Sequence, residues 1–464
     1  MKTRKLLLPS VALGVAALAL GGCGVQGSSG SSDAAQSSSG ASDDTTKAIM
    51  EVTDEELEGA TVTLARFFGD CNETTDGVTD LDMATTECEA IQILTNIFEE
   101  ENKWGIKVER MGGAAWHSYY DGLNAALASS DRPTLAVMHG SNVPEYADRN
   151  LLVEVPSELG VDPADFTAAA KSATEYDGKQ YAVPFDSHAI ISHLNLDILE
   201  EAGLLDDDGV YTPPTSPEEL YAHGKAVKEK TGKTYFDVAL TGDPMGSRLF
   251  EGLIYQQGSD LLDPETGEVF LNTDEAKNSL EVINTLVDEG YSNPTSDYDG
   301  SMQSFLRGDS AIMYNGSWAV NQFAEETPFE YGVADTPMIF DTPATWANSH
   351  VWAVPVQDNA DPVAYRAAFE LAKFYNDNTG NWAIKTGHMP ASQEALDSAE
   401  YLAAPFRESY LETAREYGKL PPRVVEWPAV EAAIIESIEG TWLSGASIDS
   451  TLESLQTQVE GLIK

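Results

Sequence analysis

The sequence predicts an α/β fold built around more than one hydrophobic core. Segments with strand patterns and segments with helix patterns alternate between residues 61 and 138, and this order is typical of a parallel sheet covered by helices. Roughly 400 residues follow the polar N-terminal segment, which is more than one core accommodates. Hydrophobic residues make up 42% of the chain, as expected of a globular protein.

The first residues have the pattern of an export signal. Three basic residues among the first five precede an apolar run over residues 6–20, and two glycines then precede Cys23. A basic start, a short apolar core and small residues at a cleavage point are typical of a signal peptide. The run is too short to span a bilayer comfortably. We therefore predict that residues 1–22 form a signal peptide.

Residues 20–23 (LGGC) resemble the lipobox of bacterial lipoproteins, in which the cysteine is lipidated and becomes the mature N-terminus. Residues 24–46 are almost wholly Ser, Gly, Ala, Gln, Asp and Thr, a composition that behaves as a flexible tether. We expect residues 23–57 to hold lipidated Cys23 and this tether on the extracellular face of a cell membrane, as suits a Gram-positive bacterium. An ordinary signal peptide with an unrelated cysteine is the alternative.

The strand and helix signals follow one another along the first third of the body. Residues 61–67 (TVTLARF) alternate and are rich in β-branched side chains, which predicts a strand. Residues 89–104 place their apolar side chains on one helical face. Residues 106–111, 116–129 and 135–138 continue as strand, helix and strand. This order predicts a parallel sheet.

Later segments predict further strands and a set of helices. Residues 178–184 and 189–194 are extended in pattern. A helix is predicted over residues 216–230, because Ser216 can cap it and Pro217 suits its first position. Other predicted helices cover residues 245–257, 273–289 and 363–376, with several more after residue 394.

The charge of the chain restricts its partners. The formal net charge is −49, and so acidic a protein has little with which to neutralise phosphate groups. We therefore expect neither nucleic acid nor an anionic lipid surface as a partner. Acidic residues are spread along the whole body, which favours a role in solubility over a role in cation binding.

Two cysteines remain beside Cys23, namely Cys71 and Cys88. An even pair in an exported chain predicts a disulfide. A redox site is less favoured, because the spacing is far from Cys-x-x-Cys.

Several catalytic and cofactor motifs are absent from the sequence. It contains no P-loop, no His-Glu-x-x-His and no Gly-x-Ser-x-Gly segment. The Gly-x-Gly-x-x-Gly match at residues 22–27 lies across the lipobox with no strand before it. The seven histidines are scattered, with none at metal-ligand spacing on one helix. We therefore predict no catalytic residue, no cofactor and no metal.

Several motifs, in order, resemble those of bacterial extracellular solute-binding protein family 1, the sugar-binding receptors of ABC importers that are related to maltose-binding protein. The resemblance spans residues 58–464. Two departures are Ser216, where the family usually has Trp, and Leu194, where it usually has Tyr. The segments that carry the resemblance are residues 135–155, 176–184 (YDGKQYAVP), 213–220 (PPTSPEEL), 305–318 (FLRGDSAIMYNGSW) and 386–390 (TGHMP).

The resemblance implies a two-lobe fold of the type II periplasmic-binding-protein kind, with three hinge crossings and closure of the lobes around a ligand. The crossings are expected near residues 186–190, 334–337 and 376–380. Lobe one would comprise residues 58–186 plus 337–376, and lobe two residues 187–336 plus 377–464.

A sugar-binding cleft needs aromatic plates and planar hydrogen-bonding side chains. The resemblance places Trp318 at a stacking tryptophan, His188 at a ligand-binding glutamate and Asp70 at a sugar-contacting acid. Structural roles are the alternatives: a core tryptophan, a hinge hydrogen bond and a turn residue. The full set of candidate ligand-binding residues is Asp70, Trp116, His139, Ser141, Asn142, Asp186, His188, Trp318, Trp346, Asn348 and His350.

The resemblance implies a monomeric substrate-binding lipoprotein that captures an extracellular carbohydrate, expected to be an oligosaccharide, and delivers it to the permease of an ABC importer. No reaction would take place. One alternative is a secreted glycoside hydrolase, which would use a pair of carboxylates. Among 76 acidic residues such a pair could be found almost anywhere, so its presence neither supports nor excludes this alternative. Another is the same fold with a peptide, a polyamine or a metal as its ligand.

Overall fold

The computed structural model describes residues 44–113 and 116–463. The predicted signal peptide, Cys23 and most of the predicted tether lie outside the described residues. Within the described ranges, no helix combines the length and the apolar character needed to cross a bilayer.

The first sheet contains the parallel strands that the sequence predicts. β1 pairs in parallel with β2 on one side and β3 on the other. β12 then pairs antiparallel with both β3 and β6, so the sheet is parallel at one side and mixed at the other. In sheet order, the strands are β2 (Lys107–Gly113), β1 (Thr61–Arg66), β3 (Leu135–His139), β12 (His350–Ala353) and β6 (Ala182–Pro184).

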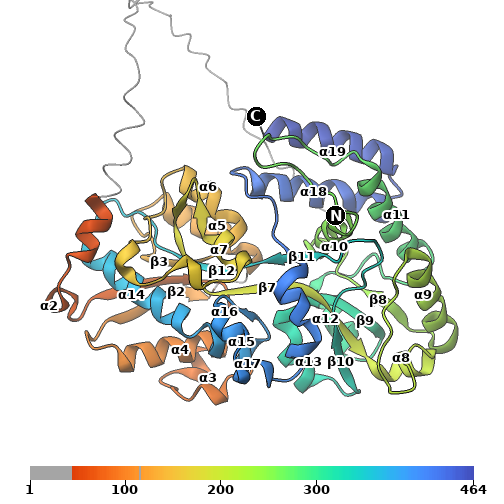
Figure 1. Ribbon diagram of the computed structural model, residues 1–464, viewed down its shortest axis with the longest axis horizontal. Coiled ribbons are helices and arrows are strands. Elements are labelled where there is room, and N and C mark those ends of the chain that lie inside the picture. The colour runs from red at the N-terminus through yellow and green to blue at the C-terminus, as the bar shows by residue number, and fades with distance from the viewer. Residues whose placement is uncertain (1–43, 114–115, 464) are drawn as a thin grey trace, which may run out of the picture. The chain divides into compact units, whose positions relative to one another are not determined.

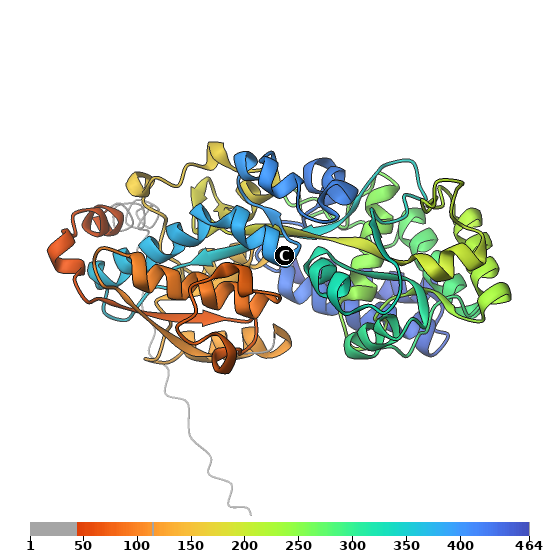
Figure 2. The ribbon, with the colours of Figure 1, turned by 90° about the horizontal axis from the view of Figure 1, so that it is seen from below.

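Helices cover the first sheet and complete a core that we call the first lobe. The apolar face of α4 is buried as predicted, and α4 packs beside α14, as the orange and blue helices of Figure 2 show. Trp352 is fully buried in this core and stacks on Tyr375. The helices of this part are α2 (Asp54–Leu57), α3 (Asn72–Thr75), α4 (Glu87–Glu101), α5 (Trp116–Leu127), α6 (Val143–Asp148), α7 (Ala168–Thr174), α14 (Pro362–Asp377) and α15 (Thr379–Thr386).

The second sheet is built around one long strand. β7 is buried along its whole length and pairs antiparallel with β13 and β11 near its start and with β9 and β10 near its end. Figure 1 shows β7 running from the first lobe toward β8 and β9. The strands are β7 (Asp186–Asn195), β8 (Thr234–Asp237), β9 (Ser310–Gly316), β10 (Tyr331–Ala334), β11 (Thr345–Asn348), β13 (Met389–Pro390) and β14 (Gly418–Lys419); β4 (Glu175–Tyr176) and β5 (Lys179–Gln180) form a separate hairpin.

A second core of similar size packs against this sheet and defines the second lobe. Ser216 caps α9 as predicted and accepts a hydrogen bond from the Glu219 backbone N–H, but the Glu219 carboxylate accepts from Thr215 instead of closing a capping box. The remaining helices are α8 (Leu196–Ala202), α9 (Pro217–Thr231), α10 (Met245–Gln256), α11 (Asp274–Asp288), α12 (Tyr298–Leu306), α13 (Val320–Glu326), α16 (Gln393–Leu396), α17 (Ala399–Leu402), α18 (Trp427–Leu443) and α19 (Ile448–Leu462).

In the described part of the chain, three segments connect the two sheets, and two of them differ from their expected positions. The chain leaves the first sheet after β6 and enters β7 at Asp186, as expected. It returns between β11 and β12, at Ser349, rather than near residues 334–337. The reason is Gln256, whose side-chain amide donates to the carbonyls of Pro337 and Ala344 and holds this segment on the second core.

The third connection runs from α14 through α15 to β13. Trp382 on α15 packs in the first core, although the sequence placed residues 377–464 in lobe two. Met389 and Pro390 then pair with the start of β7. All three connections therefore meet around Asp186.

The Cys71–Cys88 disulfide that the sequence predicts is present. It joins the start of α3 to the first turn of α4 and closes a segment with a sequence separation of 17. The disulfide thus fixes the N-terminal end of α4, which carries Glu87.

Replacement of both cysteines by serine should lower the free energy of unfolding by about 3 kcal/mol, because the denatured chain gains the freedom of an open loop of this length. Urea denaturation of the oxidised protein and of the double variant measures the difference. Dithiothreitol should reproduce the loss in the natural protein and leave the variant unchanged; equal stability of all samples would contradict the prediction.

His193 is a buried histidine on β7 that is held neutral. Its Nε2 lies 3.0 Å from the Gly316 carbonyl oxygen, which can only accept, so Nε2 carries the proton. Its Nδ1 then accepts from the Tyr331 hydroxyl at 2.7 Å. Burial lowers the pKa of His193 to about 3.

Because the pKa of His193 is lower in the folded state than in the unfolded state, its stabilising contribution is complete above the unfolded pKa and is lost as the pH falls. Between pH 8 and pH 5 the loss should be about 2 kcal/mol, given an unfolded pKa near 6.5. Urea denaturation at the two pH values should show a smaller pH dependence in His193→Gln. The half-buried His223 provides the control, because His223→Gln should change the pH dependence less; identical pH dependence in all three proteins would contradict the assignment.

Candidate functional site

The main candidate site is a cleft of about 220 Å³ lined by residues of both lobes. Aromatic and titratable side chains share its wall. Phe67 and His139 stack face to face with ring centroids 5.0 Å apart. Phe67 directly follows β1 and His139 is the last residue of β3, so both lie at the carboxyl edge of the parallel strands. The lining residues are Phe67, Phe68, Glu87, Trp116, His139, His188, Asp243, Arg248, Tyr298, Trp318 and His350.

Two tryptophans from different lobes form part of this wall. Trp116 begins α5 in the first lobe and is 37% exposed. Trp318 follows β9 in the second lobe, and its indole N–H donates to the Tyr298 hydroxyl at 2.9 Å. Its ring lies over Gly316, where a Cβ atom would come within 2.0 Å of the ring. Gly316 therefore allows Trp318 to turn its ring along the sheet and into the cleft wall.

Arg248 lies among three tryptophans. Its guanidinium carbon is 4.2 Å from the ring centroid of Trp346, 5.7 Å from that of Trp116 and 5.9 Å from that of Trp318. A cation over aromatic faces is attracted by their negative charge density. One Nη1–H of Arg248 donates to Met245 Sδ at 3.3 Å, and its other N–H donors remain available beside this aromatic wall.

A second hollow of about 150 Å³ adjoins the cleft and shares Trp116, His139 and Arg248 with it. Asn348 and Ser141 are joined there by two hydrogen bonds: the Asn348 side-chain amide donates to the Ser141 hydroxyl at 2.9 Å, and the Ser141 backbone N–H donates to the Asn348 side-chain oxygen at 3.3 Å. The two volumes together reach the lower end of the range typical of small-molecule sites, about 300–1,000 Å³.

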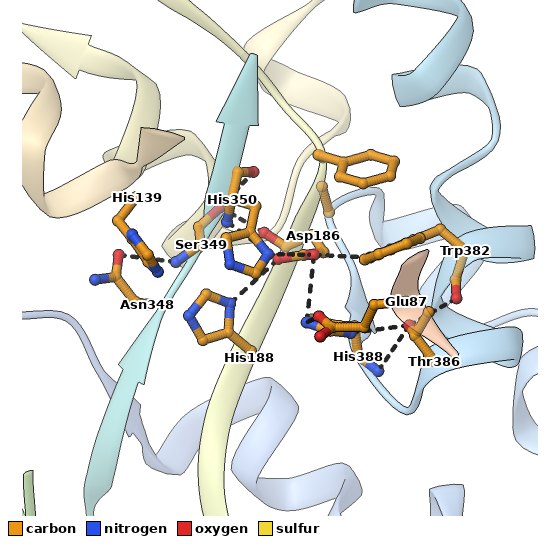
Figure 3. A network of polar contacts seen from close by, with 12 residues as sticks. Glu87, His139, Asp186, His188, Asn348, Ser349, His350, Trp382, Thr386 and His388 are labelled. Atoms are coloured by element: carbon orange, nitrogen blue, oxygen red, sulfur yellow. Dashed lines mark hydrogen bonds and ion pairs between the residues drawn. The ribbon is translucent and has the colours of Figure 1, made fainter. Parts of the chain in front are cut away.

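A buried cluster of histidines lies beneath the cleft and surrounds Asp186 (Figure 3). The Asp186 carboxylate accepts from the backbone N–H of His350 at 3.0 Å, from His350 Nδ1 at 2.8 Å and from Trp382 Nε1 at 2.7 Å. His188 Nδ1 lies 3.3 Å from Asp186 Oδ1, and His388 Nε2 lies 3.7 Å from Asp186 Oδ2. One carboxylate thus organises side chains from all three connections.

Burial controls the charge of this cluster. It lowers the pKa of His188 to about 4 and that of His388 well below its usual range, so both rings are neutral at neutral pH. Burial opposes ionisation of Asp186, but contacts with His350, His388 and His188 outweigh it and hold the pKa well below its ordinary value. Burial raises the pKa of Glu87, beside His388, to about 7.

The structure brings most of the sequence-predicted site residues together. Trp116, His139, His188, Trp318 and His350 line the cleft. The adjoining hollow is lined by Ser141, Asn142, Trp346 and Asn348.

Two predicted residues lie elsewhere. Asp186 lies beneath the cleft wall, fully buried. Asp70 lies outside both hollows, where its exposed carboxylate pairs with Arg110 at 3.1 Å. It is displaced from the cleft because Phe67 and Phe68 take up the wall position directly after β1.

Sequence reasoning missed several lining residues. Phe67 and Phe68 could have been found by the rule that drew attention to His139, since they too follow a parallel strand. Glu87, Asp243, Arg248 and Tyr298 lie on helices or loops whose patterns carry no such signal. The histidine cluster combines positions 186, 188, 350 and 388, which no local spacing connects.

Comparisons with known proteins agree with this architecture. The family model of bacterial extracellular solute-binding proteins matches residues 94–408. The maltotriose-binding protein of Pyrococcus abyssi is 24% identical over 353 residues, which cover 73% of this chain and 72% of that protein. The arabinooligosaccharide-binding protein of Halalkalibacterium halodurans is 28% identical over 214 residues, which cover 42% of this chain and 45% of that protein.

Solved structures share the two-lobe fold. Maltose-bound MalE3 of T. maritima superposes with a TM-score of 0.73 at 18% identity, covering 87% of this chain and all of that one. The GacH receptor of Streptomyces glaucescens superposes with a TM-score of 0.72 at 20% identity, covering 87% and 98%. The predicted fold, a type II periplasmic-binding-protein fold, is thereby confirmed.

Proposed function

We propose that this chain, which belongs to the bacterial extracellular solute-binding protein family, is the carbohydrate receptor of an ABC importer. It captures an oligosaccharide in the cleft between its lobes and delivers it to a membrane permease. The sugar is bound and released unchanged.

The observation that carries this proposal is the pair of tryptophans on opposite lobes with Arg248 among them. Sugar rings have apolar C–H faces, which stack on indoles, and polar edges, which need planar hydrogen-bonding groups. The cleft offers both kinds of group within one wall, together with Glu87 and Asp243 as carboxylate acceptors. A ligand that touches Trp116 and Trp318 at once holds the two lobes together, which is the closing motion of such receptors.

The names of the relatives support the carbohydrate assignment. Their ligands include maltotriose, arabino-oligosaccharides, lactose and diacetylchitobiose. These sugars differ in their linkages but share the alternation of apolar faces and polar edges. The proposed contacts in this chain are Trp116, Trp318 and Arg248 in the cleft, with Ser141 and Asn348 in the adjoining hollow.

Attachment to the membrane through lipidated Cys23 forms part of the proposal. The tether that follows it would keep the receptor near its permease and raise the effective concentration of the receptor there. In a cell without an outer membrane, such an anchor also prevents loss of the receptor to the medium.

Thermal unfolding in the presence of maltotriose, arabinotriose, lactose and diacetylchitobiose tests the proposal. A ligand at 100 times its Kd stabilises the folded state by about 2.7 kcal/mol, and calorimetric titration then gives the affinity. Chromatography of the same mixtures should show the sugars intact. Release of smaller sugars would overturn the binding-only function, and stabilisation by a polyamine or a peptide, but by no carbohydrate in a wider panel, would overturn the ligand class.

A further inference from the structure

The histidine cluster draws one residue or more from each connection between the lobes. Asp186 and His188 lie on β7, His350 begins β12, and His388 follows α15 (Figure 3). One donor atom from each of the four residues lies within 4.8 Å of every other, and all four residues are buried. Such convergence of three imidazoles and a carboxylate is the donor set of a metal site.

The distances from Asp186 to the three histidines are close to those between ligands of a tetrahedrally coordinated ion. Zinc binds imidazole nitrogen and carboxylate oxygen at about 2.0–2.2 Å, so neighbouring ligands of a tetrahedral site lie roughly 3.4 Å apart. The Asp186 oxygens lie 2.8 Å from His350 Nδ1, 3.3 Å from His188 Nδ1 and 3.7 Å from His388 Nε2. The three Asp186 distances lie on either side of this value, while donor separations across the cluster reach at most 4.8 Å. The ligands must therefore draw together around the ion, which also replaces the His350 Nδ1 proton that Asp186 accepts in its absence.

His388 provides an independent observation. Its Nδ1 lies 2.8 Å from the Thr386 hydroxyl, which already donates its own proton to the Trp382 carbonyl. The hydroxyl therefore accepts from His388, and in the neutral ring Nε2 carries a lone pair. This fully buried Nε2 has no hydrogen-bond partner.

The Nε2 lone pair of His388 faces two carboxyl groups. His388 Nε2 faces the carboxylate of Asp186 at 3.7 Å and that of Glu87 at 3.4 Å. A lone pair aimed at ionised carboxylates is unfavourable unless a proton on Glu87, whose pKa burial raises to about 7, or a metal cation lies between them. Thr386 and Trp382, which hold His388 and Asp186 from behind, are placed like the outer-shell partners that orient metal ligands.

We propose that Asp186, His188, His350 and His388 bind a divalent first-row transition-metal ion, with Zn²⁺ as the best fit to three imidazoles and one carboxylate. Glu87 lies at the edge of this site as an additional oxygen donor. Because His188 and His350 also line the cleft, the ion forms part of the floor beneath the sugar-binding wall. It is a resident ion that ties the three connections together and is distinct from the transported solute.

Titration of the purified protein, stripped with EDTA and free of any polyhistidine tag, with ZnCl₂ tests the site by calorimetry. One ion should bind per chain, and Co²⁺ in its place should give the visible absorption of tetrahedral coordination. His388→Gln should weaken Zn²⁺ binding more than the roughly 10- to 100-fold loss typical of an outer-shell change, which Thr386→Val should show.

His193→Gln is the matched control, since His193 is equally buried on β7 but lies outside the cluster; it should bind Zn²⁺ like the natural protein. If His388→Gln does not fold, His188→Asn and Thr386→Val still decide the question. Absence of stoichiometric Zn²⁺ binding, or equal affinities in cluster and control variants, would overturn the site. Carbohydrate binding is measured separately in EDTA, so failure of the metal site and failure of the proposed function are distinguishable.

Discussion

Replacement of Trp318 by alanine should weaken oligosaccharide binding by at least about 30-fold in Kd, or about 2 kcal/mol, the loss typical of a central aromatic contact. Trp318 lies in the cleft wall with its indole fixed by the Tyr298 hydroxyl. A sugar that stacks on this ring gains contact with a surface that needs no reordering on binding. Calorimetric titration with the sugar identified by thermal unfolding measures the change.

A second variant separates binding from folding. Trp318 is partly buried and packs against two apolar clusters of the second lobe, so Trp318→Ala should also lose roughly 1–3 kcal/mol of folding stability. Trp116, with 37% of its surface exposed, carries less of the fold. Trp116→Ala should therefore weaken binding by a similar factor while the melting temperature of the free protein changes little.

Trp104 provides the control, because it lies outside both hollows in the first lobe and bonds to Asp54. Trp104→Ala should bind the sugar with unchanged affinity. If Trp116→Ala and Trp318→Ala also bound it normally, the cleft would not be the sugar site.

The fold could be predicted from local patterns because those patterns reflect its construction. The alternation over residues 61–138 predicted the parallel strands, and β1 pairs with β2 and β3 in that way. The position of the second crossing could not be predicted in the same manner. It depends on Gln256, whose side chain holds a segment some eighty residues away, and nothing in the sequence of that segment indicates the partner.

The same distinction applies to the site. His139 was predicted as a site residue because ligands of α/β folds bind beyond the carboxyl ends of parallel strands, and it lines the cleft. Arg248 was missed because its importance arises from three tryptophans that lie far from it in the sequence. The sequence has no histidine pair at metal-ligand spacing on one helix, whereas the histidine cluster is assembled where three separate connections meet.

Replacement of Asp186 by alanine should destabilise the protein by about 3–5 kcal/mol, even in EDTA, because the variant leaves buried donors without an acceptor. The Asp186 carboxylate accepts from Trp382 Nε1 and from both the backbone and the ring of His350. Asp186 is fully buried, so water cannot readily take its place. Urea denaturation at pH 7 measures the loss.

Asp237 offers a matched control for this variant. It is also buried on a strand of the second sheet, but its carboxylate accepts from the Ser301 hydroxyl, and its pKa is raised by burial rather than lowered. Because burial disfavours the ionised form of Asp237, its carboxylate stabilises the fold less than that of Asp186. Asp237→Ala should therefore lower the free energy of unfolding less than Asp186→Ala does. Equal losses would show that burial of any aspartate has this effect, whereas a larger loss for Asp186→Ala would identify it as the residue on which the three connections depend.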